Sequence, residues 1–152
     1  MLAGDQPEKV HCPAPSRAGA NAAAGDTVSL VRLLCFHRDF HAAEALVHET
    51  HDPGAAFHLA RQLEAEHNAV GAIRYFEMAG RFNHAVRVAR GAGMVQEVVT
   101  LALRATPDVM LDAARFLESA GETERAVQLY HRGRDLPKAL QLCFEGRFFD
   151  QL

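Results

Sequence analysis

From Asp26 onward, short apolar stretches alternate with polar and glycine-containing breaks. Within the stretches the apolar residues recur at helical intervals, and no alternating pattern of the kind typical of strands competes with them. The pattern therefore predicts an all-α protein. The expected helices lie near residues 27–36, 40–50, 54–66, 69–79, 82–90, 94–104, 107–119, 122–132 and 135–145.

Capping residues support these boundaries. Asp26, Asp39 and the pair Thr106-Pro107 precede apolar runs, where side-chain caps and first-turn prolines are favoured. Glycine tolerates the left-handed conformation at a helix C-terminus. Three glycines stand where helices should end: Gly80, Gly91 and Gly121. The short connections predict antiparallel neighbours, packed as hairpins.

Two parts of the chain superpose with a shift of 54 residues and no gap. Such an internal repeat is typical of a solenoid, whose long surfaces usually bind other proteins. The matched pairs are Ala60/Ala114, Arg61/Arg115, Leu63/Leu117, Glu64/Glu118, Ala72/Ala126, Ile73/Val127, Phe76/Tyr130, Phe82/Leu136, Ala85/Ala139, Val86/Leu140 and Val88/Leu142.

The spacing inside each copy is that of a tetratricopeptide-type hairpin. Small residues (Ala60 and Ala72 in the first copy) let two helices approach, and an aromatic residue, Phe76, fills the space between them. A hairpin of about 27 residues is shorter than the usual repeat of about 34. We therefore expect a tetratricopeptide-like α-solenoid of stacked antiparallel helix hairpins.

The two ends differ from the repeat segment. Residues 1–25 are rich in Ala, Gly and Pro and predict a disordered tail, so the helical segment is expected to span 26–152. Under the 54-residue shift Phe148 and Phe149 fall on the start of a full apolar helix that this chain does not complete. The last helix is therefore expected to be truncated, with Phe148 and Phe149 offering an apolar docking patch.

Charge and composition exclude several functional classes. The formal net charge is -3, with 49% hydrophobic and 23% charged residues, which disfavours a nucleic-acid-binding domain. No uninterrupted apolar run approaches the about 18 residues that a membrane helix needs, and the N-terminus has no signal-peptide pattern. A soluble, non-secreted protein without direct membrane insertion is expected.

Cysteines and histidines give no pattern that requires a metal, a cofactor or catalysis. Cys12, Cys35 and Cys143 lack the pairing of a disulfide framework or zinc ribbon, and Cys35 and Cys143 lie in apolar stripes as small hydrophobes. His37 and His41 have the spacing of a helical metal pair, but Asp39 between them is a predicted cap that separates them. No nucleophile–base pair or phosphate loop is present, so an enzyme is disfavoured and no catalytic, cofactor or metal residue is assigned.

Arginine is the main candidate for partner binding. Fourteen of the sixteen basic residues are arginine, which favours bidentate contacts with carboxylates. A local excess of positive charge predicts an acidic partner, although a solvated helix face is the competing interpretation. Its candidate contact residues are Arg74, Arg81, Arg87 and Arg90. The repeated pairs Arg61/Glu64 and Arg115/Glu118 predict weak salt bridges within one helix.

Several segments are similar to the C-terminal helical region of the intraflagellar transport protein 140 family. The similarity runs from about Gly25 to Leu152, and these 152 residues do not include the N-terminal WD40 propellers that members of that family carry. The segments that carry it are Gly25 to Arg32, Phe57 to Glu64, Ala72 to Ala79, Phe82 to Arg87, Pro107 to Arg115, Arg125 to His131 and Lys138 to Leu140.

This resemblance implies a non-catalytic scaffold segment of intraflagellar transport complex A. It implies roles in retrograde ciliary transport and cilium assembly, in the cilium, the ciliary base and the cytoplasm. Other complex A subunits and adaptors for ciliary membrane cargo would be the partners. The alternative is a generic tetratricopeptide adaptor or vesicle-trafficking solenoid. Its carboxylate-clamp version needs asparagine where this chain has Arg61 and Arg115.

Overall fold

The computed structural model describes the backbone of residues 17–146 and the side chains of residues 25–146. Over these residues the chain forms nine helices and no strand, which confirms the all-α prediction. The helices are α1 (Arg17–Phe36), α2 (Phe40–Thr50), α3 (Pro53–Ala65), α4 (Ala69–Met78), α5 (Phe82–Gly91), α6 (Val95–Ala102), α7 (Pro107–Ser119), α8 (Thr123–Arg132) and α9 (Leu136–Gly146).

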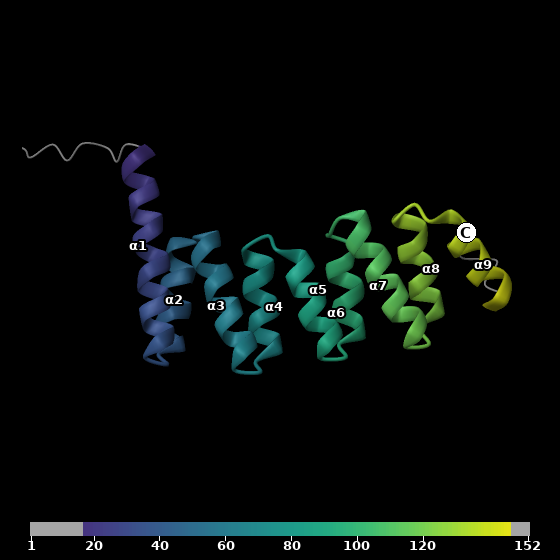
Figure 1. Cartoon of the computed structure of the whole chain (residues 1–152), viewed down its shortest axis with the longest axis horizontal. Coiled ribbons are helices and arrows are strands. Elements are labelled where there is room, and N and C mark those ends of the chain that lie inside the picture. Colours follow the sequence, from purple (N-terminus) through teal and green to yellow (C-terminus); the bar gives the residue numbers. More distant parts are fainter. Residues whose placement is uncertain (1–16, 147–152) are drawn as a thin grey trace, which may run out of the picture.

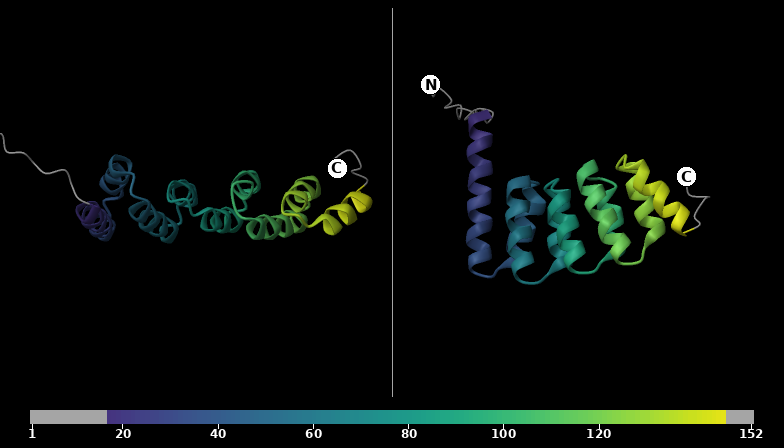
Figure 2. Two further views of the ribbon diagram at one scale, coloured as in Figure 1. Left: turned by 90° about the horizontal axis from the view of Figure 1, so that it is seen from above. Right: turned by 45° about the vertical axis from the view of Figure 1, so that its right-hand side comes forward.

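The helices stand side by side along one long axis (Figure 1). Seen from above, they alternate between two rows, with the odd-numbered helices in one row and the even-numbered helices in the other (Figure 2). Each helix packs on its neighbour in sequence, and α1–α3, α5–α7 and α6–α8 also touch within the rows. This stacking confirms the predicted solenoid of antiparallel hairpins.

The first helix begins well before its expected start at residue 27. α1 starts at Arg17 and passes through Asp26, so Asp26 does not cap it. Alanine, the strongest helix former, dominates residues 18–24 and outweighs the cost of about 1 kcal/mol for each glycine. A helix over 17–25 differs from the disordered tail expected there, and residues 1–16 lie outside the described residues.

The core follows the repeat. Ala60 and Ala72 are fully buried where α3 meets α4, and Phe76 fills the space beside them with no exposed surface. In the second copy Ala114 and Ala126 of α7 and α8 are equally buried, as the sequence predicts. No polar or charged residue of the described part is buried. The hydrophobic effect therefore acts along a continuous seam between the rows.

Tight turns join most of the helices, and equivalent turns use different residues in the two copies. After α3 the left-handed residue is His67 (φ 60°), and its counterpart after α7 is Gly121 (φ 81°). After α4 it is Gly80 (φ 68°), and its counterpart after α8 is Arg134 (φ 68°). The backbone of each turn is therefore kept even where a side chain must accept a conformation that favours glycine.

α5 ends at the predicted place, but the left-handed residue expected there lies two positions later. Gly91 is the last residue of α5, and the left-handed residue of the turn is Gly93 (φ 68°). The N–H of Met94 donates to the carbonyl of Ala89 at 2.9 Å and closes the turn. The segment contains two glycines, and the backbone needs the freedom of the second one.

Candidate functional site

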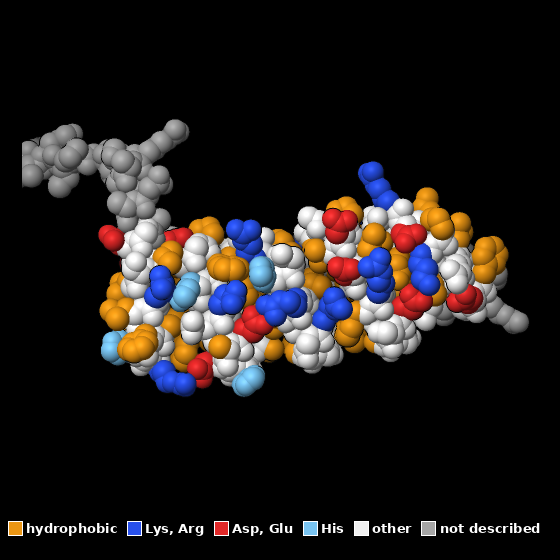
Figure 3. Space-filling view, in the orientation of Figure 1, with side chains coloured by type: hydrophobic (Ala, Val, Ile, Leu, Met, Phe, Trp, Pro, Cys, Tyr) orange, Lys and Arg blue, Asp and Glu red, His pale blue; other side chains and the backbone are white. Residues whose placement is uncertain are grey.

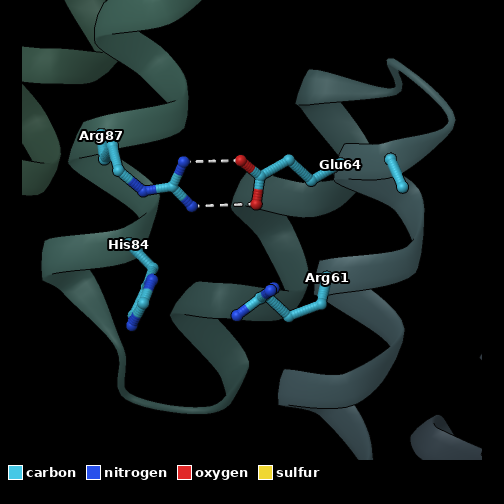
Figure 4. A pocket seen from close by; sticks show the side chains of 5 residues that line it. Arg61, Glu64, His84 and Arg87 are labelled. Carbon is cyan, nitrogen blue, oxygen red and sulfur yellow. Dashed lines mark hydrogen bonds and ion pairs between the residues drawn. The ribbon is translucent and has the colours of Figure 1, made fainter.

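Side chains of α3 and α5 line an open pocket of about 530 Å³ (Figure 4). A neighbouring pocket of about 470 Å³ shares two of these side chains, Glu64 and Arg87. We name the whole region the α3–α5 groove and define it by Arg61, Glu64, His84 and Arg87. The groove lies on the row of odd-numbered helices, between two successive hairpins.

An ion pair crosses the groove. Arg87 of α5 donates two hydrogen bonds to the carboxylate of Glu64 on α3, with N–O distances of 2.6 and 2.9 Å. This contact lowers the pKa of Glu64 below its usual value and raises that of Arg87. Because the Arg87 side chain is half exposed, the pair is worth about 0.2–1 kcal/mol. The pair braces the α3–α4 hairpin against the α5–α6 hairpin.

The predicted pair within α3 is therefore wrong. Glu64 bonds to Arg87 on the following hairpin, not to Arg61 on its own helix. The bidentate geometry explains this choice, because two parallel charge-assisted bonds outweigh one weak contact along a helix. Arg61 is exposed and forms no ion pair with any residue that the structure describes.

The second copy departs from the expected pairing in the same way. Arg115 bonds to Asp112 at 2.9 Å, within α7. Glu118 bonds instead to Lys138 of α9 at 3.0 Å and accepts a hydrogen bond of 2.9 Å from the hydroxyl of Tyr130. This environment raises the pKa of Tyr130 to about 12, mainly through burial and then through the Glu118 bond. Both repeated glutamates thus bond to the next hairpin.

An aromatic cluster lies behind the groove, and His84 is its member that lines the pocket. The ring of His84 stacks on Phe76, with centroids 5.2 Å apart and an interplanar angle of 19°. Phe57 of α3 meets both rings edge-on, at 5.6 Å from Phe76 and 5.3 Å from His84. The guanidinium carbon of Arg81 lies 6.0 Å from the centre of the Phe57 ring. The packing holds the imidazole of His84 in place beside Arg61 and Arg87.

Positive charge dominates this part of the surface. The pKa of His84 is lowered, first by burial and then by Arg87 and Arg61, while Glu64 opposes the shift. The pKa of His58 on α3 is lowered by burial, by Arg32 of α1 and by Arg61. On the face shown in Figure 3, basic side chains and histidines accordingly outnumber acidic ones over the α1 to α5 half, whereas acidic and basic side chains mix over the α6 to α9 half. Three helices contribute to one cationic surface.

The four arginines expected to bind a partner do not form one site. Arg87 lies in the α3–α5 groove, and Arg81 lies at its edge over Phe57. Arg90 lies at the end of α5, with its guanidinium 5.5 Å from the ring of Phe116. Arg74 is on α4, in the other row, and lines a separate small pocket. Phe148 and Phe149 lie outside the described residues.

Two residues of the groove, Arg61 and His84, cannot be recognised as binding residues from the sequence. The spacing within α3 pairs Arg61 with Glu64, so it does not reveal that the guanidinium of Arg61 is unpaired. His84 is only one of nine histidines in the sequence. The 54-residue shift carries a signal for it, because His84 aligns with Lys138, and both positions face the repeated glutamate. The alignment identifies His84 as a groove residue only once the position of the α5–α6 hairpin next to α3 is known.

The other candidate chemistry is structural. Asp39 caps α2 by accepting a hydrogen bond from the N–H of Ala42 at 3.1 Å, which places His37 in the turn and His41 on the helix. No group of three or more His, Cys, Asp or Glu side chains in the described residues could hold a metal ion. Cys35 and Cys143 are buried, and burial raises the pKa of Cys35. Cys12 lies outside the described residues.

The family model for the TPR domain of intraflagellar transport proteins 140 and 172 matches residues 18–152. The chain belongs to this family. The match covers almost the whole solenoid and confirms the resemblance to the C-terminal tetratricopeptide-like region of intraflagellar transport protein 140. The family associates the chain with intraflagellar transport and with protein interaction, in a type of fold that is typically non-catalytic. Within the described residues, none of the helices has the length and apolar character to cross a membrane.

Proposed function

We propose that the chain is a non-catalytic scaffold segment of intraflagellar transport complex A. In this role it supports retrograde ciliary transport and cilium assembly by binding other complex A subunits and adaptors for ciliary membrane cargo. It acts in the cilium, at the ciliary base and in the cytoplasm. The observation that carries the proposal is the family match over 18–152, on a solenoid whose two rows expose long faces.

The α3–α5 groove supports a binding role for one of these faces. Arg61 is exposed and stands outside the Glu64–Arg87 ion pair of the groove, whereas its counterpart Arg115 is paired with Asp112. Solenoids use such extended faces to hold partners. Arg74 and Arg90 lie outside the groove and remain proposed contacts on other faces. Phe148 and Phe149 remain the proposed contact at the C-terminal end.

Affinity capture tests the scaffold proposal. The tagged chain is incubated with extract from ciliated cells at moderate salt, beside an unrelated tetratricopeptide protein with the same tag. Enrichment of complex A subunits on this chain alone is the expected result. Recovery of chaperones alone, with a chain that is helical by circular dichroism, would contradict the proposal. The double variant Phe148→Ala/Phe149→Ala tests the end contact separately, because it should reduce capture without loss of helicity.

A generic tetratricopeptide adaptor or vesicle-trafficking solenoid is the second candidate. The groove favours it, because a row of basic side chains suits a peptide or coat partner unrelated to cilia. The same capture separates the two functions. Enrichment of coat or vesicle proteins without any complex A subunit would support the adaptor function.

A further inference from the structure

The surface over α1, α3 and α5 gathers arginine and histidine side chains. His58 interacts electrostatically with Arg32 and Arg61, and His84 interacts with Arg61 and Arg87. Glu64 is the one acidic side chain that lines the α3–α5 pocket, and both of its carboxylate oxygens are bonded to Arg87. Mutual repulsion among the remaining cations is a cost that an external anion would relieve.

We infer that the α3–α5 groove binds an acidic linear segment of a partner protein, with Arg61 and Arg32 contacting its carboxylates. The inference rests on the proposed protein-binding function and names the chemistry of the partner. Figure 4 shows the guanidinium of Arg61 extending from α3 on the side of the groove where His84 lies. An anion placed there would meet Arg61 and His84 together.

The groove itself shows how it would hold a carboxylate. The Glu64–Arg87 pair is a bidentate carboxylate–guanidinium contact in the same pocket. Arg61 offers the same planar group to a carboxylate from outside. The ring of His84, which stacks on the buried Phe76, and the half-buried ring of Phe57 beside it add apolar surface, which suits a peptide that carries an apolar residue beside its acidic ones.

A nucleic acid fits less well. The net charge of the chain is -3, and binding to a phosphate backbone usually requires a markedly basic domain. The positive surface also ends after α5, because Arg115 and Lys138 further along the row are paired with Asp112 and Glu118. A short cationic surface of three helices matches a short acidic peptide.

Proton uptake should accompany binding. His84 is faced by Arg61 and Glu64 from α3, by Arg87 from its own helix and by Arg81 just before that helix. His58 is faced by Arg32 and Arg61. A bound carboxylate would offset the cations and raise the lowered pKa values of both histidines. The complex would then hold more protons than the free protein, so affinity should increase as pH falls from about 7.5 to about 6.

Fluorescence anisotropy with a short labelled peptide rich in Asp and Glu, with one Leu, tests the inference on the full chain. The matched probe has Asn and Gln in place of the acidic residues. The variant Arg61→Gln should weaken binding of the acidic peptide about tenfold, which is the scale of one charge-assisted contact. Arg115→Gln is the matched control, because it changes the equivalent arginine of the second copy, and it should leave the affinity unchanged.

Each result of the binding experiment either supports or overturns the inference that the groove binds an acidic segment. Binding that favours the acidic peptide, weakens in Arg61→Gln and falls as salt rises above about 0.1 M supports the inference. Equal loss in Arg61→Gln and Arg115→Gln, equal binding of both peptides, or no binding would overturn it. So would competition by a single-stranded RNA or by phosphatidylserine vesicles at lower concentration than by the unlabelled peptide. If the peptide fails but complex A subunits are still captured, the groove inference fails and the scaffold proposal stands.

Discussion

The two copies of the repeat, α3 to α5 and α7 to α9, share a core but differ in their polar contacts. Ala60 and Ala114 are buried at the same place, and Phe76 and Tyr130 occupy the same interhelical space. In each copy a glutamate near the end of the first helix bonds to the next hairpin. The shared contact is therefore a brace between hairpins, which the apolar pattern alone does not reveal.

The cation that bonds to the glutamate comes from different positions in the two copies. In the second copy Lys138 and the hydroxyl of Tyr130 both bond to Glu118. In the first copy Phe76 has no hydroxyl and His84 stands where Lys138 stands, so the guanidinium of Arg87, one turn further along, holds Glu64. As a result, the first copy has a histidine and an unpaired arginine in its groove, whereas the equivalent Lys138 and Arg115 of the second copy are both ion-paired. Packing constrains the core of both copies, whereas their surfaces can diverge in charge.

The largest expected loss of stability comes from the aromatic position that the two copies share. Phe76→Ala removes a fully buried ring and should lower the free energy of unfolding by about 3–5 kcal/mol. Urea unfolding followed by circular dichroism measures the change. Val70→Ala on the same helix is the control, because Val70 is 67% exposed and should change little. A loss below that of the control would show that the ring does not join the two helices.

The hydroxyl of Tyr130 is the next largest difference between the copies. Tyr130→Phe makes the second copy resemble the first and removes the hydrogen bond to Glu118. The expected loss of unfolding free energy is about 1.5 kcal/mol, the lower end for bonds to a charged acceptor, because the Glu118 side chain is 34% exposed. An unchanged urea midpoint would show that Lys138 alone holds the brace. In that case, Lys138→Met should carry the whole effect.

The sequence predicts the core better than the surface, for a physical reason. Helical periodicity and the 54-residue repeat place Ala60, Ala72 and Phe76 in the core, because burial follows from spacing along a single helix. Ion pairs depend on where the next hairpin lies, so the pairing of Glu64 with Arg87 does not follow from spacing within α3. The predicted cap at Asp26 is wrong because the alanine-rich run before it extends the helix to Arg17, so Asp26 lies inside the helix.

The turns of the two copies can be exchanged. Arg134 holds a left-handed conformation that its counterpart Gly80 adopts without strain. Arg134→Gly should raise the free energy of unfolding, and Gly80→Ala should lower it, each by about 1 kcal/mol. The opposite signs make the pair its own control, again by urea unfolding. If both changes destabilise the chain, the Arg134 side chain contributes contacts that outweigh its backbone strain.

The smallest expected effect is the pH dependence of the first copy. The pKa values of His58 and His84 are lowered in the folded chain from the ordinary value of 6.5. Below that value the unfolded chain therefore binds more protons than the folded chain, and the free energy of unfolding should fall as pH decreases from about 7.5 to about 5.5. Urea unfolding at several pH values measures this slope. His58→Gln/His84→Gln should flatten it, because it removes the two imidazoles whose pKa values are lowered by the fold. A stability that rises as pH falls would mean that both imidazoles are better protonated in the fold, contrary to the cationic surface that surrounds them.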